Sequence, residues 1–224
     1  MDIKAKNLRQ YLHCKSFKYS TNKYPFKEKL EVLYGIPLES IHEFIGSFEK
    51  FERKNDQNTL AHKVFYSNFK QIIEPLYLEF IQDVIKDIIY PYKFYFQKIP
   101  TFRLGLPGNT FVGEYHRDSH YNHQSYEINF NLGLSNYLGE ASLRTEYTPN
   151  KKDWKLLECP YGSIFSFDHI DCTHGSEPNR SNLSMTSFDF RIALFDLYFE
   201  SDSSSVNMNT QFRPGSYFSN YLIN

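Results

Sequence analysis

A histidine and an aspartate separated by one residue are the first feature of this sequence that could do chemistry. They are His116 and Asp118, at the end of a predicted strand. Side chains at i and i+2 of a strand point to the same face, so these two can converge on one metal ion while Arg117 points away. The alternative is that His116 and Asp118 form only a hydrogen-bonded pair on the strand.

A third metal ligand has to come from another segment, and we predict His174 in that role. Two neutral imidazoles and one carboxylate make a facial triad suited to Fe(II), and such a triad leaves coordination positions open for substrate and O2. The predicted metal ligands, which are also the predicted catalytic residues, are therefore His116, Asp118 and His174. His169 is the alternative source of the third imidazole.

The segments that must position these residues change character near residue 92. Before it, apolar residues such as Leu38 and Ile41 recur at helical spacing, and Thr59 and Pro75 are expected to begin one helix and to break it. After it, apolar and polar residues alternate and turns follow at short intervals, which predicts strands. The predicted strands cover residues 100–109, 110–118, 125–134, 140–147, 154–158, 162–169 and 184–199.

A helical layer followed by this many strands predicts a single domain that is mainly β with an α layer, in the α+β class. The expected architecture is a β-sandwich or jelly roll with the N-terminal helices packed on one sheet. The aromatic content of 18% fits half-buried strands, although a biased codon composition explains it equally well. We divide the domain, residues 1–224, into a mainly helical part (1–91), a β core (92–200) and a C-terminal tail (201–224).

The charge balance and the apolar patterning exclude several classes of partner. The net charge is −1, with 25 basic and 26 acidic residues, so the overall charge gives no electrostatic attraction to nucleic acid or to an anionic membrane. No apolar run approaches the ~20 residues that a membrane span needs. The three cysteines lack paired spacing and suit a reducing compartment. We expect a cytoplasmic protein that acts on small molecules, with no nucleic acid and no membrane as partner.

The β core carries a series of motifs in a recognisable order. INFNLGL is followed by GEASL, and then by YGSIFSFD, HGSEPN and SFDFR. This order resembles the Fe(II)/2-oxoglutarate-dependent oxygenases, in particular the streptomycin-biosynthesis oxygenase-like and phytanoyl-CoA-hydroxylase-like group. The stretch LESIHE also looks like the N-terminal part of that group, so the resemblance spans roughly residues 28–200. It implies a double-stranded β-helix, which is a variant of the jelly roll.

The resemblance also implies an iron site and a cosubstrate site. By it, the three predicted ligands hold Fe(II), and a cation holds the distal carboxylate of 2-oxoglutarate. Arg191 is the first choice for that cation, because a guanidinium binds a carboxylate through two hydrogen bonds. In a common pattern of the group, an arginine follows the distal histidine by about ten residues. In this chain that position is Ser184, with Thr186 two residues further on, and neither is charged. The further candidates for binding the cosubstrate are Arg103, Arg144, Asn129 and Thr186, and Asp189 is the alternative partner of Arg191.

The implied reaction is the oxidation of a small molecule with O2 and 2-oxoglutarate. Asp118 favours hydroxylation over halogenation, because halogenating relatives carry a small residue at that position. The expected substrate is a small polar metabolite, such as a sugar, an aminocyclitol or an amino-acid derivative, in a biosynthetic pathway. Two alternatives stay open: a cupin-like dioxygenase or isomerase that needs no 2-oxoglutarate, and a non-enzymatic jelly-roll module that binds carbohydrate. The oligomeric state is open as well.

Overall fold

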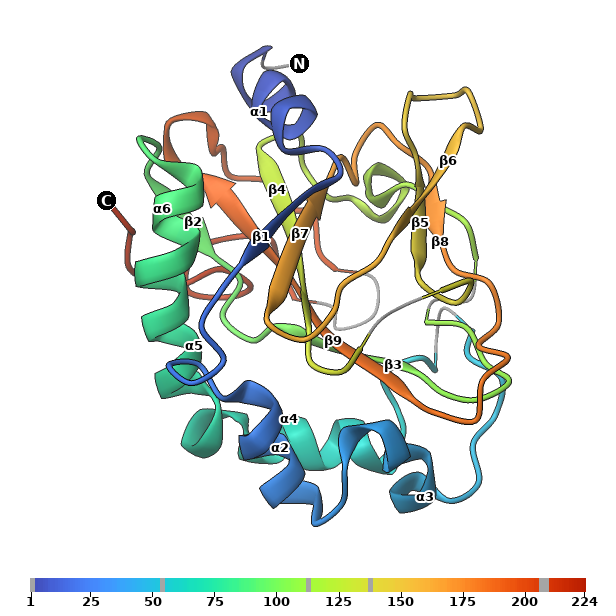
Figure 1. Ribbon diagram of the computed structural model, residues 1–224. Coiled ribbons are helices and arrows are strands. Elements are labelled where there is room, and N and C mark those ends of the chain that lie inside the picture. Colours follow the sequence, from blue (N-terminus) through green and yellow to red (C-terminus); the bar gives the residue numbers. More distant parts are fainter. Residues whose placement is uncertain (1–2, 53–54, 112–113, 137–138, 206–209) are drawn as a thin grey trace.

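Two antiparallel sheets of unequal size make up the β part of the chain (Figure 1). The computed structural model describes residues 3–52, 55–111, 114–136, 139–205 and 210–224. Within these ranges the larger sheet has the strand order β1-β7-β4-β9-β2, with β3 paired to β9, and the smaller sheet has the order β6-β5-β8. The strands are β1 (Lys15–Lys18), β2 (Phe94–Phe96), β3 (Thr101–Gly105), β4 (Glu127–Gly133), β5 (Leu143–Glu146), β6 (Trp154–Leu157), β7 (Ser163–Phe167), β8 (His174–Gly175) and β9 (Met185–Leu194).

Strand β9 is the central element of the larger sheet. It pairs with β4 on one side, and on the other side first with β3 and then with β2. All of its residues are buried. Arg191 stands opposite Asn129, and Asp189 stands opposite Asn131, so these four side chains share one face of the sheet. Phe188, between them in sequence, points to the other face because successive strand residues alternate.

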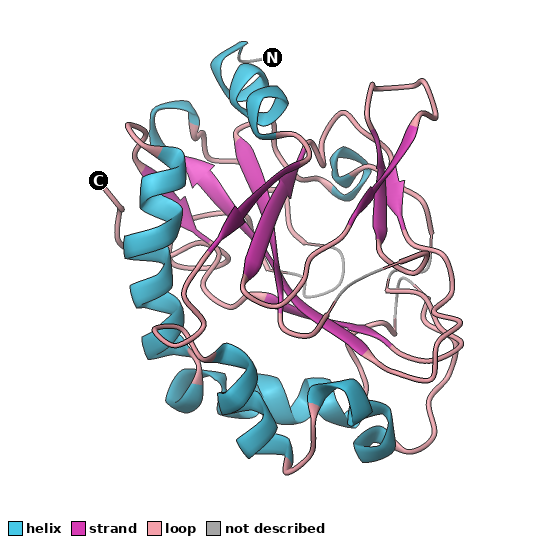
Figure 2. Cartoon of the chain, viewed as in Figure 1, coloured by secondary structure: helices cyan, strands magenta, loops and turns pink. Residues whose placement is uncertain are grey.

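Helices cover that other face, which lies along the left and bottom of the view in Figure 2. The Phe188 ring lies 5.7 Å from the Phe26 ring and 5.4 Å from the Phe65 ring, so both layers share one apolar contact zone. This arrangement confirms the predicted α+β class. No helix within the described ranges has both the length and the apolar character of a membrane span. The helices are α1 (Ile3–Leu12), α2 (Phe26–Tyr34), η1 (Leu38–Ser40), α3 (Ile41–Ile45), α4 (Leu60–Ile72), α5 (Glu74–Phe80), η2 (Ile81–Ile85), α6 (Lys86–Ile89), η3 (Asp118–Tyr121) and η4 (Phe195–Leu197).

Two predicted helix boundaries are confirmed. Thr59 caps α4, because its Oγ1 accepts a hydrogen bond from the backbone N–H of His62 at 3.4 Å. Pro75 lies in the first turn of α5, and α4 ends at Ile72. Proline has no N–H to donate to the preceding turn, so it is tolerated at a helix start and not in a helix interior.

The prediction of a strand over residues 110–118 is wrong wherever the structure tests it. Residues 112–113 lie outside the described residues. His116 forms only an isolated bridge, with His174, and Asp118 begins the 3-10 helix η3. The backbone N–H of Asp118 donates to a carbonyl of the β7–β8 loop at 2.8 Å, which takes the chain out of the extended conformation. The same-face argument for the two ligands therefore does not hold in its original form.

Helices α1 and α2 and strands β1, β2 and β8 are among the elements that were not predicted from the sequence. Strand β1 is a short edge strand in which only Phe17 is apolar, so it shows no alternation, and its pairing with β7 defines it. One cluster of buried apolar side chains extends from Ala5 in α1 to Ile223 near the C-terminus. In the described part of the tail, Phe212 and Phe218 are also buried, whereas residues 206–209 lie outside the described residues.

Candidate metal centre

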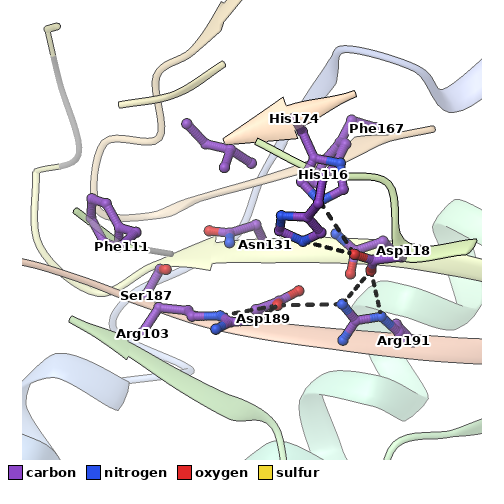
Figure 3. A pocket seen from close by; sticks show the side chains of 12 residues that line it. Arg103, Phe111, His116, Asp118, Asn131, Phe167, His174, Ser187, Asp189 and Arg191 are labelled. Carbon is purple, nitrogen blue, oxygen red and sulfur yellow. Dashed lines mark hydrogen bonds and ion pairs between the residues drawn. The ribbon is translucent and has the colours of Figure 1, made fainter. Parts of the chain in front are cut away.

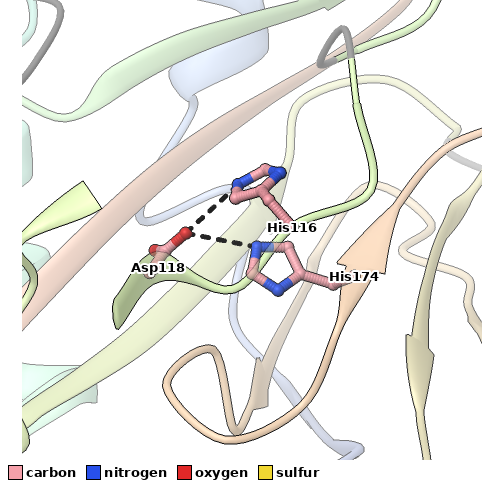
Figure 4. Close-up of side chains that lie close together, drawn as sticks. All are labelled: His116, Asp118 and His174. Carbon is pink, nitrogen blue, oxygen red and sulfur yellow. Dashed lines mark ion pairs between the residues drawn. The ribbon is translucent and has the colours of Figure 1, made fainter. Parts of the chain in front are cut away.

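His116, Asp118 and His174 come together, as Figure 4 shows. One potential ligand atom from each residue lies within 4.8 Å of the other two. The Nε2 atoms of His116 and His174 both lie 3.3 Å from Oδ1 of Asp118. Ligand atoms placed at right angles around an ion at about 2.1 Å would lie about 3 Å apart, so this spacing fits a shared metal ion.

The hydrogen bonds of the two imidazoles fix which nitrogen faces the carboxylate. Nδ1 of His116 lies 2.8 Å from the carbonyl oxygen of Glu114, and Nδ1 of His174 lies 3.2 Å from that of Cys172. A carbonyl only accepts, so each Nδ1 carries a proton, and Nε2 is the nitrogen left to bind a metal ion. Such an outer hydrogen bond to a ligating imidazole is the usual arrangement at metal sites.

The charge state of the site favours a metal ion over extra protons. Burial and the neighbouring His116 lower the pKa of His174, which opposes a proton on its Nε2. Burial by itself would raise the pKa of Asp118, but Arg191 and the two imidazoles outweigh it and hold that pKa well below its usual range. A buried carboxylate oxygen thus faces two imidazole nitrogens, and a metal ion between them would satisfy all three.

A line of alternating charges runs from Asp118 across the floor of the site (Figure 3). Arg191 donates from Nε and Nη2 to Oδ2 of Asp118, at 3.2 and 2.6 Å. Its Nη2 also lies 3.6 Å from Oδ2 of Asp189. Arg103 donates from Nε and Nη2 to the same Asp189 oxygen, at 3.2 and 3.0 Å, and from Nη1 to Asp56 at 2.8 Å. Both arginines are therefore bound to carboxylates of the chain itself.

Buried bonds also hold the β7–β8 loop, which carries the chain into His174. Oδ1 of Asp168 accepts from the backbone N–H groups of Ile170 and Asp171, at 3.3 and 3.1 Å. The same oxygen accepts from Nε of the fully buried Arg9 at 2.9 Å. Helix α1 thus fixes the loop that places the second imidazole.

The triad lies at the wall of a pocket of about 400 Å³, open mouth included. Two polar atoms on its floor, Oδ1 of Asn131 and Oγ of Ser187, are buried and find no hydrogen-bond partner among the described residues. They are available to a bound molecule. The pocket is lined by Arg103, Phe111, His116, Asp118, Asn129, Asn131, Leu143, Phe167, His174, Ser187, Asp189 and Arg191.

The predicted cosubstrate residues divide into two groups. Arg191, Arg103 and Asn129 line the pocket. In the amide orientation that its neighbours require, Asn129 donates to Oδ1 of Asp189 at 2.8 Å and so supports the charged floor. Thr186 does not line the pocket, because strand alternation turns it to the helix-covered face. Arg144 also lies apart from the pocket and pairs with the exposed Glu140 at 2.8 Å.

His169, the alternative third imidazole, is fully buried but does not join the triad. Neither of its ring nitrogens has a hydrogen-bond partner among the described residues. Burial lowers its pKa well below the usual range, so it stays neutral. The structure thus brings His174, and not His169, to the two other ligands.

Several pocket residues were not predicted. Ser187 was detectable, because it shares the alternation of Asp189 and Arg191 along one strand. Asp56, which binds Arg103 without lining the pocket itself, comes from a polar loop with no periodicity, and nothing in the sequence connects the two residues. The apolar lining residues Phe111, Leu143 and Phe167 are indistinguishable from core residues by type.

Comparisons with known proteins give one relative with extensive coverage. No protein-family model matches the chain. The streptomycin biosynthesis protein StrG of Streptomyces griseus is 28% identical over 201 residues, which cover 90% of this chain and 95% of StrG.

The solved structures that align with this chain have lower sequence identity to it. The nickel complex of ThoJ, described as a non-haem monooxygenase, has 11% identity and a TM-score of 0.45, covering 94% of this chain and 85% of ThoJ. SnoK, described as a non-haem alpha-ketoglutarate-dependent carbocyclase from nogalamycin biosynthesis, has 12% identity and a TM-score of 0.46, covering 86% and 84%. HygX from Streptomyces hygroscopicus, with nickel and 2-oxoglutarate bound, has 10% identity and a TM-score of 0.39, covering 97% and 96%. At this distance, we base no assignment on them.

Proposed function

We propose that the chain is an Fe(II)- and 2-oxoglutarate-dependent oxygenase that hydroxylates a small polar metabolite. The observation that carries the proposal is the convergence of two imidazole Nε2 atoms, from His116 and His174, on one oxygen of the buried Asp118. Two histidines and one carboxylate with open positions are the donor set of non-haem Fe(II) oxygenases. A relative named for streptomycin biosynthesis is compatible with a small metabolite as substrate.

The strand order supports a double-stranded β-helix as the architecture of this site. Strands β7-β4-β9-β3 form one sheet of the β core, and β6-β5-β8 form the other, with His116 bridged to β8 at its edge. Sheets that face each other in this way place a pocket between them. Because one apolar cluster extends from α1 to the C-terminal tail, the proposal treats residues 1–224 as one domain.

Within the pocket we assign the distal carboxylate of 2-oxoglutarate to Arg103. Its side chain is 15% exposed, against 6% for Arg191. Both inner donors of Arg191 are already taken by Asp118. A guanidinium binds a carboxylate through two parallel hydrogen bonds, so a ligand carboxylate at Arg103 would take the place of Asp56 or Asp189 on it.

The chain's own residues bind the metal ion, orient the small molecules and exclude water. When bound, Fe(II) and 2-oxoglutarate supply the O2 activation that oxidation of a C–H bond requires. The three ligands hold the ion on one side and leave the other side to small molecules. Asn131 and Ser187 offer hydrogen bonds from the floor, and the rings of Phe111 and Phe167 keep water from the reacting atoms.

The test is an anaerobic titration of the purified protein with Fe(II) and then with 2-oxoglutarate. We expect a visible metal-to-ligand charge-transfer band when the cosubstrate chelates the ion. His174→Ala should raise the dissociation constant for Fe(II) by more than about 100-fold, since even an outer-shell change costs about 10–100-fold.

His120→Ala is the matched control, because His120 is an exposed histidine on the neighbouring helix η3. It should leave iron affinity unchanged. Wild-type protein that holds iron but gives no band would refute the 2-oxoglutarate part. Equal iron affinity in wild type and His174→Ala would refute the metal site itself.

A further inference from the structure

Arg191 contacts the candidate metal site through hydrogen bonds to one oxygen of the ligand Asp118. Its side chain is 6% exposed, and its Nε and Nη2 both donate to Oδ2 of Asp118. The other oxygen of that carboxylate, Oδ1, is the one that both imidazoles face at 3.3 Å. The two oxygens of Asp118 thus have separate partners.

A second layer of bonds keeps the Arg191 guanidinium in place. Its Nη1 donates to the hydroxyl of Tyr217 at 3.4 Å, and that hydroxyl donates to Oε1 of Gln97 at 2.8 Å. The same Gln97 oxygen accepts from the backbone N–H of Arg191 at 3.2 Å. Gln97 and Tyr217 therefore hold the Arg191 backbone and guanidinium on the side away from Asp118.

We propose that Arg191 is a positioning residue for Asp118: it holds Oδ2 so that Oδ1 alone is presented to the metal ion. The inference rests on the proposed metal site and deepens it. A carboxylate without this hold can rotate and present both oxygens, which would fill a coordination position that the cosubstrate or O2 needs. It can also turn away from the ion, which would weaken metal binding.

The planar fork of the guanidinium is what this role requires. Two donors on one carboxylate oxygen fix the position of that oxygen against the planar guanidinium, whereas a lysine ammonium supplies charge without a rigid fork. A role in charge balance alone, between Asp118 and Asp189, would be satisfied by lysine. Replacement of Arg191 by lysine therefore separates positioning from neutralisation.

Arg191 is poorly placed to anchor a ligand carboxylate. Such a carboxylate would have to compete with Asp118 for Nε and Nη2, and the remaining nitrogen, Nη1, faces Tyr217. Arg103 lies in the same pocket and binds Asp189, and within the described residues it makes no hydrogen bond to Asp118. The two arginines therefore offer a matched pair of the same type with different expected roles.

The experiment is an anaerobic titration with Co(II) alone, without 2-oxoglutarate, followed through its visible absorption. Arg191→Lys should weaken Co(II) binding by about 10–100-fold and change the intensity of the band, because the coordination of Asp118 changes. Arg103→Lys should leave the Co(II) dissociation constant within about twofold and leave the band unchanged. Arg191→Lys that binds Co(II) like wild type, with the same band, would overturn the proposal.

Tyr217→Phe is a second variant that keeps both charges and removes only the hydroxyl behind Arg191. It should weaken Co(II) binding severalfold, in the range expected for loss of one hydrogen bond, about 2- to 12-fold. If Arg191→Lys does not fold by near-ultraviolet circular dichroism, unchanged Co(II) affinity and band in Tyr217→Phe overturn the proposal.

The same titration distinguishes this inference from the proposed function. Wild-type protein that binds Co(II) in an Arg191-dependent way but shows no 2-oxoglutarate band would refute the oxygenase and support the role of Arg191. Wild-type protein that binds no Co(II) would overturn both.

Discussion

The two faces of strand β9 are equally buried and differ completely in chemistry. On the helix side, Phe188 and Phe190 are 0% exposed and pack against rings of three helices. On the pocket side, Ser187 is 0% exposed, Asp189 6% and Arg191 5%. Burial therefore does not distinguish the faces, and residue type does.

The comparison teaches which face stabilises the fold and which face serves a ligand. Apolar area buried on the helix side contributes about 25 cal/mol per Å² to folding. On the other side, the removal of Asp189 and Arg191 from water costs several kcal/mol per ion, and their pairing only offsets this cost. A protein with well-packed apolar residues at these positions would often be as stable. Folding stability alone does not explain the charged face, whereas the binding of a ligand in the pocket does.

The largest expected effect is on the helix face. Phe188→Ala should lower the free energy of unfolding by about 3–5 kcal/mol, because it removes a ring from a packed aromatic layer and leaves a cavity. Chemical denaturation measures it. Phe195→Ala is the control, since Phe195 is 41% exposed and should cost much less.

Metal affinity of the folded Phe188→Ala protein decides whether the two faces are independent. We expect it to lie within about twofold of that of wild type, because the Phe188 ring packs against the helices and does not line the pocket. A parallel loss of stability and metal affinity would show that the faces are coupled through β9.

The next effect is the pH dependence contributed by His62, which is buried on the helix side. Burial lowers its pKa to about 4, from an ordinary value of 6.5. The unfolded chain therefore binds the extra proton between these values, so stability is present above about pH 6.5 and is lost as the pH falls to about 4. The expected loss is about 3 kcal/mol.

Denaturation of wild type and His62→Gln at several pH values measures that contribution. The difference between the two proteins should shrink as the pH falls through the window, because only wild type loses the stability of a neutral His62. The difference should also be the same with and without bound metal, because His62 does not line the pocket. A constant difference across the window would contradict the assignment.

The smallest effects come from two adjacent hydroxyl residues on opposite faces of β9. Neither Oγ1 of Thr186 nor Oγ of Ser187 has a hydrogen-bond partner among the described residues. Thr186→Val removes an unsatisfied polar atom from the apolar side and should raise the free energy of unfolding by about 1 kcal/mol. Ser187→Ala should leave stability within about 0.5 kcal/mol.

Ser187→Ala should instead weaken the binding of a pocket ligand, by up to about tenfold, as loss of one hydrogen bond predicts. Titration with 2-oxoglutarate, and later with substrate, measures it, and Thr186→Val should leave that affinity unchanged. The reverse pattern would mean that the assignment of the faces is wrong.

Much of the β core could be predicted from the sequence, because alternation is a local property. The strands around residues 127–133, 163–167 and 185–194 fall inside predicted segments. Strand β1 could not be predicted, since its pairing with β7 defines it and its own residues are mostly polar. The extended conformation predicted for Asp118 failed because a bond to a distant loop turns the chain there.

The sequence by itself determined the types of ligand and, through alternation, that Ser187, Asp189 and Arg191 share one face. Only the tertiary structure decided that His174 rather than His169 meets Asp118, and that Arg191 is bound to Asp118. These choices depend on how the β7–β8 loop and η3 lie against each other. That arrangement comes from bonds between segments far apart in the chain, such as Arg9 to Asp168, and no local pattern records them.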